Sequence, residues 1–114
     1  MKGFQYMDIR VEKIIGSFLE NGWRMIGPID ISTDWWFDEI ILIESVWNPV
    51  GKKLYLAVLT DPMEVKQKEI WGVSVSSVIP ENRSGEPLGL VTLTEVKKID
   101  LKKFVQSINN SVLQ

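Results

Sequence analysis

The sequence predicts an α+β domain: a single antiparallel sheet of four to five strands, with an N-terminal and a C-terminal helix packed on it. Segments with the apolar spacing of a helix lie near both ends of the chain, and strand-like segments lie between them. Short turns join these strands without a crossover helix, and such strands pair antiparallel. A length of 114 residues predicts that residues 1–114 form a single domain.

Each predicted helix has an apolar stripe and recognisable ends. The first is expected over about residues 8 to 21, with Asp8 as its N-cap and Asn21-Gly22 at its end. The second begins after the N-cap residue Asp100. The two stripes are Val11, Ile14, Ile15, Phe18 and Leu19 in the first helix, and Leu101, Phe104, Val105 and Ile108 in the second.

Five segments between the helices are expected as strands. They are residues 23–26, 36–47, 54–59, 69–79 and 88–96. The second and third are joined by a turn at residues 47–51 and form the clearest hairpin. Residues 40–43 are apolar on both faces, which predicts a central strand that is covered on both sides.

The strand at 69–79 alternates between large and small residues. Trp71, Val73 and Val75 are expected on one face, and Gly72, Ser74 and Ser76 on the other. The small face is predicted to receive the first helix at Gly16; a ligand or a partner strand is the alternative occupant.

The chain contains no histidine and no cysteine, whereas it contains five tryptophans. It therefore lacks the side chain best suited to proton transfer near neutral pH, the most reactive thiol nucleophile, and the usual zinc, copper and haem ligands. We expect no catalytic residues, no cofactor and no metal site. A chain without disulfides also suits a reducing compartment, so we expect a soluble, cytoplasmic protein.

The charge balance and hydropathy exclude two classes of partner from the prediction. A net charge of −2 and a pI near 5.1 argue against nucleic acid, which is bound by an excess of Lys and Arg. The longest apolar run, residues 54–59, falls far short of the ~20 residues that span a bilayer, so no membrane is expected. The N-terminal residues also lack the pattern of a signal peptide.

The most distinctive local feature is an acidic and aromatic segment. Residues 30–44 contain five carboxylates around Trp35 and Trp36, and no Lys or Arg occurs between Met25 and Gly51. Such a surface suits a cation, a sugar or a basic protein face. The alternative is structural: one tryptophan anchors the core while the acids keep the strand entrance hydrated. Because neighbouring strand residues point to opposite faces, one of the two indoles is expected at the surface.

The leading functional hypothesis is a non-enzymatic protein-interaction domain, an adaptor, inhibitor or immunity-type partner that binds another protein or a second copy of itself. The expected binding residues are Asp34, Trp35, Trp36, Asp38, Glu39, Trp47 and Trp71. The alternative is a small-molecule or carbohydrate binder, or a weak hydrolase, with a pocket lined by some of these tryptophans. A cavity of at least ~300 Å³ touching two tryptophans and a carboxylate would favour the alternative.

Overall fold

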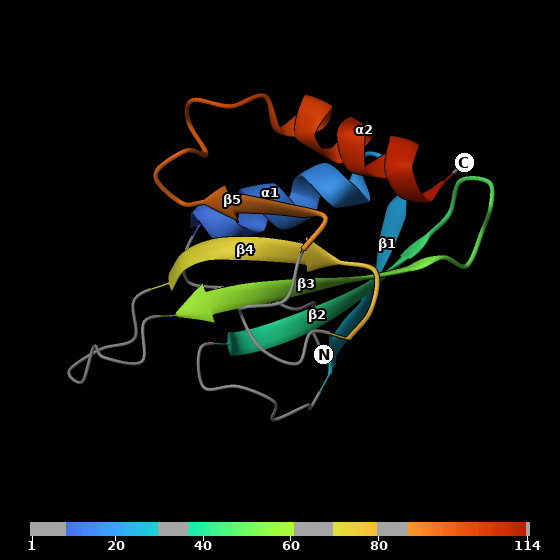
Figure 1. The fold of residues 1–114 in the computed structure, drawn as a ribbon, viewed down its shortest axis with the longest axis horizontal. Helices are drawn as coiled ribbons and strands as arrows, with labels where there is room; N and C mark the ends of the chain where they lie inside the picture. The colour runs from blue at the N-terminus through green and yellow to red at the C-terminus, as the bar shows by residue number, and fades with distance from the viewer. Residues whose placement is uncertain (1–8, 30–36, 61–69, 80–86, 114) are drawn as a thin grey trace.

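Each strand of the sheet pairs with the next strand along the chain. A computed structural model describes residues 9–29, 37–60, 70–79 and 87–113. Within these residues the elements are α1 (Ile9–Leu19), β1 (Trp23–Ile29), β2 (Phe37–Ser45), β3 (Lys53–Thr60), β4 (Ile70–Ser76), β5 (Gly89–Thr92) and α2 (Leu101–Val112). The described strands form one antiparallel sheet in the order β1-β2-β3-β4-β5 (Figure 1). The predicted α+β class is confirmed.

Both described helices cover the same face of the sheet (Figure 1). The apolar stripes predicted from the sequence are the residues that pack there: Val11, Ile14, Ile15 and Phe18 from α1, and Val105 and Ile108 from α2, are buried. Phe18 and Phe104 join the two helices by an edge-to-face contact, with ring centroids 6.3 Å apart. The core is therefore a layer between the helices and one face of the sheet.

A buried chain of hydrogen bonds fastens α2 to the other elements. The indole Nε1 of Trp23 donates to Oδ1 of Asn109 at 2.7 Å, and Nδ2 of Asn109 donates to the backbone oxygen of Asn21 at 2.9 Å. The Asn21 side chain in turn donates to the backbone oxygen of Ser17 at 2.7 Å. Among the described residues no buried side-chain nitrogen or oxygen lacks a hydrogen-bond partner, so a tryptophan and an asparagine are accommodated inside an apolar layer.

The helix ends follow the predicted chemistry where the structure describes them. Oδ1 of Asp100 accepts a hydrogen bond from the backbone nitrogen of Lys103, which confirms the N-cap of α2. Gly22 adopts a φ of +102° just after α1, a conformation that glycine takes without a steric penalty. Asp8, the predicted cap of α1, lies outside the described residues.

The two edge strands differ in length from the prediction. β1 continues through Gly27 and Pro28 to Ile29, with a bulge between Met25 and Gly27, because an edge strand tolerates a proline. β5 ends at Thr92, well before the predicted end. There a Glu95 carboxylate oxygen accepts hydrogen bonds from the backbone nitrogen of Thr92 at 3.0 Å and its hydroxyl at 2.6 Å, and the chain turns away.

The middle of β2 is buried on both faces of the sheet, as predicted. Ile40 is 2% exposed and its neighbour Ile41 is fully buried, although they point to opposite sides of β2. Ile41 belongs to the core under the helices. Ile40 belongs to a second, smaller cluster on the opposite face, with Ala57 and Leu59, against which Ile29, Tyr55 and Trp71 pack.

The predicted arrangement around Trp71 is wrong. The register of β3 with β4 shifts here: Leu59 pairs with Gly72 and Thr60 pairs with Ile70, so the pairing of these two strands passes over Trp71. This irregularity places the Trp71 side chain on the second cluster, away from Val73 and Val75 in the helix-covered core.

The predicted contact between Gly16 and the small-residue face is wrong as well. A Cβ built on Gly16 would meet nothing within 4 Å, and α1 covers the other face of the sheet. A Cβ on Gly72 would instead lie 3.0 Å from the backbone oxygen of Val91. The lack of a side chain at Gly72 therefore allows β5 to approach closely.

Candidate functional site

The structure separates the predicted binding residues that it describes. Asp34, Trp35 and Trp36 lie outside the described residues, and Asp38 is described through its backbone alone. Glu39 lies near the start of β2 and Trp47 just beyond its end, so about eight residues, or ~26 Å of extended chain, separate them. Trp47 therefore belongs to a different surface from Glu39.

Glu39 and Trp71 lie toward the same end of the sheet but on different faces. Glu39 is half-buried and pairs with Val58, a residue of the core under the helices. Trp71 is half-buried against the second cluster on the opposite face. A single ligand on one face of the sheet does not contact both side chains.

The β2–β3 hairpin presents Trp47 in a loop held by internal hydrogen bonds. Ser45 is fully buried, and its hydroxyl donates to the backbone oxygen of Pro49 at 2.6 Å while accepting from the backbone nitrogen of Lys52 at 2.9 Å. Ser45 and Lys52 also pair through their backbones, and Gly51 donates to the Ser45 oxygen at 3.1 Å. One buried hydroxyl thus fixes the path of the whole loop.

The hairpin is also fastened to the turn that follows α1. The backbone nitrogen of Val46 donates to the Gly22 oxygen at 2.8 Å. The indole of Trp47 lies directly on Gly22, where a Cβ would come within 2.6 Å of the ring atoms Cδ2 and Cε3. Because Gly22 has no side chain, one part of the indole packs directly on its backbone, and the rest of the ring faces solvent.

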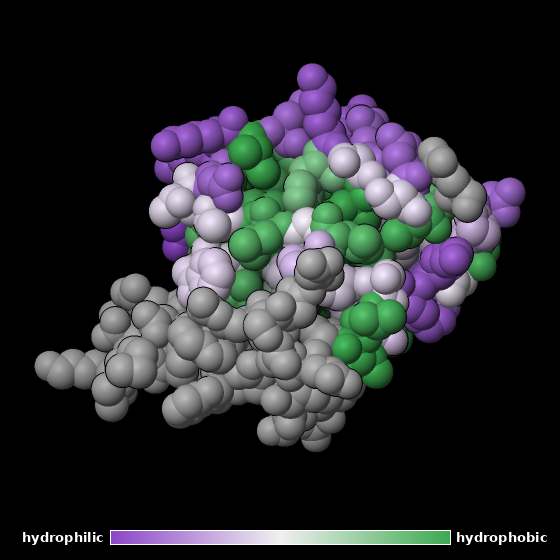
Figure 2. Space-filling model, in the orientation of Figure 1, coloured by the Kyte–Doolittle hydropathy of each residue, from purple (hydrophilic) through white to green (hydrophobic). Residues whose placement is uncertain are grey.

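Large apolar side chains are exposed together at this hairpin. Val46 is 46% exposed, Trp47 is 50% exposed and Val50 is 71% exposed. A turn at the surface is usually polar, so three exposed apolar residues within five positions are unusual. Figure 2 shows hydrophobic and hydrophilic side chains mixed at this end of the molecule, whereas hydrophilic side chains dominate over α2.

Cationic side chains surround the base of the hairpin. Glu44 lies between two of them: its Oε1 accepts a hydrogen bond from Nε of Arg24 at 2.9 Å and its Oε2 lies 2.7 Å from Nζ of Lys53. The hydrogen bond from Lys53, followed by that from Arg24, lowers the pKa of Glu44. Lys52 is exposed beside them. Three cations thus accompany one carboxylate at the base of the hairpin.

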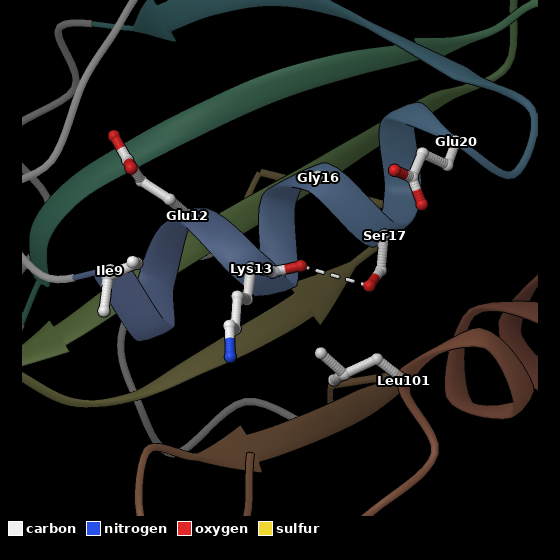
Figure 3. A pocket seen from close by; sticks show the side chains of 7 residues that line it. All are labelled: Ile9, Glu12, Lys13, Gly16, Ser17, Glu20 and Leu101. Atoms are coloured by element: carbon white, nitrogen blue, oxygen red, sulfur yellow. Dashed lines mark hydrogen bonds between the residues drawn. The ribbon is translucent and has the colours of Figure 1, made fainter. Parts of the chain in front are cut away.

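A second surface feature is a hollow of about 490 Å³ along α1 (Figure 3). Its lining residues are Ile9, Glu12, Lys13, Gly16, Ser17, Glu20 and Leu101. Figure 3 shows Gly16 in the middle of the helix between Glu12 and Glu20, with Leu101 across from α1. The hollow contains carboxylates but no tryptophan, so it differs from the Trp-lined pocket considered above.

The described residues contain no group of three or more His, Cys, Asp or Glu side chains that could hold a metal ion. In the same parts of the chain, no helix has the length and apolar character needed to cross a membrane.

Sequence reasoning predicted Trp47 as a binding residue but did not consider its exposed neighbours. Val46 was assigned to the strand at residues 36–47, and Val50 and Lys52 to turn formation alone, although valine is not a turn-forming residue. A tryptophan and a valine inside the predicted turn, with a second valine directly before it, were the available indication of an exposed apolar loop. Comparison with known proteins adds no assignment, since no family model, curated protein or solved structure matches the chain.

Proposed function

We propose that this chain is a non-enzymatic protein-interaction domain that docks through the tip of its β2–β3 hairpin, with Trp47 as the anchor. One observation carries the proposal: a half-exposed tryptophan packs on the backbone of a glycine, in a loop whose path is fixed by hydrogen bonds of a buried serine. A side chain ordered in this way loses little conformational freedom on binding, so more of the contact energy appears as affinity. Tryptophan is also the residue type most enriched among interface hot spots.

The flanking residues extend the same surface. Val46 and Val50 add apolar area beside the indole, and burial of such area supplies about 25 cal/mol per Å². The partner is another protein or a second copy of the chain. We place the protein in the cytoplasm, which the absence of cysteine supports. The alternative, a ligand pocket lined by tryptophans, gains no support from the hollow on α1.

Site-specific photo-crosslinking provides the test. A photoreactive residue replaces Val50, and in a control chain it replaces Val78, which is equally exposed at 69% but follows β4. In cells that express the chain naturally, we expect a protein crosslink from position 50 that is absent from position 78. Trp47→Ala should abolish this crosslink and lower the affinity for the identified partner by more than ~2 kcal/mol.

A folding control accompanies the affinity measurement. Trp47 is half-exposed, so Trp47→Ala is expected to leave the chain folded, as circular dichroism and a cooperative unfolding transition would show. Equal crosslinking from positions 50 and 78, or full affinity of a folded Trp47→Ala variant, would remove the proposal. A crosslink between two copies, with a dimer in sedimentation experiments, would identify the partner as the chain itself.

A further inference from the structure

The charge of the hairpin is opposite in sign to that of the whole chain. The net charge of the protein is −2, but the segment from Glu44 to Lys53 carries two lysines and one glutamate. Arg24 on the neighbouring strand adds a third cation, bound to the same glutamate. Charges beyond ~8 Å are largely screened at physiological ionic strength, so a partner at the tip responds mainly to this local cationic group.

Two of the cations are held in fixed positions at the base of the hairpin. Glu44 pairs with Arg24 on β1 and with Lys53 on β3, which lie on either side of β2. The pairing fixes two long side chains that would otherwise move freely, and it leaves an excess of positive charge. The backbone of Lys52 is held by the buried Ser45 hydroxyl, and its side chain is exposed directly after the apolar tip.

From this arrangement we infer that the hairpin recognises an acidic protein surface, in which an apolar recess receives Trp47 and carboxylates at its rim meet Lys52 and the Arg24–Lys53 pair. The inference rests on the proposed function and adds the chemistry of the partner. It differs from the sequence-based expectation of an acidic binding surface, because the hairpin that carries the exposed Trp47 has more cations than carboxylates at its base. Opposite charge at an interface rim accelerates association and selects among partners.

The test uses the partner crosslinked at position 50 and two charge-reversal variants of the full chain. Lys52→Glu changes a side chain beside the tip, while the backbone hydrogen bond to Ser45 remains available. Lys97→Glu alters the net charge equally, but it lies in the segment between β5 and α2, away from the hairpin (Figure 1). We expect Lys52→Glu to weaken binding about fivefold and Lys97→Glu to leave it unchanged.

Two further readouts separate a charge effect from a structural effect. Raising the salt concentration from about 50 mM to about 500 mM should weaken wild-type binding and reduce the difference between wild type and Lys52→Glu. The crosslinked partner peptide, or the surface next to it, should contain Asp or Glu.

The outcomes distinguish this inference from the proposed function. Binding that needs Trp47 but is insensitive to Lys52→Glu and to salt would overturn the acidic partner and leave the docking role standing. A crosslink to lipid, or none above the Val78 control, would overturn both. Weakening by Lys52→Glu and Lys97→Glu alike would show a general charge effect and would also overturn the inference.

Discussion

Asn109 is expected to be the most important polar side chain for holding α2 in place. It accepts a hydrogen bond from the Trp23 indole and donates one to the Asn21 backbone oxygen, and it is only 8% exposed. Asn109→Leu keeps the approximate size of the side chain but leaves both of these groups without their partner. Each unsatisfied buried group costs about 1–3 kcal/mol, partly offset by the added apolar side chain. We expect a net loss of about 2–4 kcal/mol in the free energy of unfolding.

Urea unfolding followed by circular dichroism measures this loss, with Asn110→Leu as the matched control. Asn110 is the next residue of α2 and is exposed, so its replacement reports the change in helix propensity alone. Trp23→Phe removes the indole donor, and in a double-mutant cycle we expect it to recover about 1 kcal/mol in the Asn109→Leu background. If Asn109→Leu is as stable as Asn110→Leu, the buried hydrogen-bond chain does not hold α2 and the reasoning fails.

Two glycines and one carboxylate give further predictions. Gly16→Ala should stabilise the protein by about 1 kcal/mol in urea unfolding, because the position is inside a helix and a Cβ meets nothing within 4 Å; a lower stability would contradict this. Gly22→Ala should destabilise it by more than ~1 kcal/mol, because φ is +102° and a Cβ would lie 2.6 Å from the Trp47 ring; unchanged stability would show that the ring is not held there. Glu44 has a lowered pKa, chiefly through its hydrogen bond with Lys53, so its contribution to stability is present above the ordinary pKa of a glutamate and is lost as the pH falls through the lowered value. Wild type should therefore be more stable than Glu44→Gln at neutral pH, and the difference should shrink in unfolding experiments at acid pH; a constant difference would refute the linkage.

Local patterns predicted most elements of the fold. The spacing of apolar residues identified the buried stripes of both helices, since 3.6-residue periodicity follows directly from helix geometry. The apolar run at residues 40–43 identified a strand buried on both faces. The predicted ends of β1 and β5 were wrong for two different reasons. The end of β1 depends on its edge position in the sheet, which is a relation between segments that no local pattern reports. The end of β5 is marked by the contact of Glu95 with Thr92, three positions away, which is a local signal that the sequence analysis missed.

The sequence predicted only part of the candidate site. Trp47 was predicted as a binding residue, but the group of cations at the base of its hairpin was not, because they come from different strands. Arg24 and Glu44 are twenty positions apart in the chain, and their pairing follows from the register of β1 with β2. The acidic composition of residues 30–44 does not report the charge at the hairpin, where Arg24, Lys52 and Lys53 outnumber Glu44.

Periodicity and residue chemistry alone determined the antiparallel α+β class, the inward faces of the helices and the cap at Asp100, because these depend on neighbours a few positions away. Only the tertiary structure decided which indole is buried with a hydrogen bond, as at Trp23, and which lies on a glycine facing solvent, as at Trp47. The physical reason is that burial depends on contacts between distant segments. A single irregularity in strand pairing, as at Trp71, moves a side chain to the other face of the sheet.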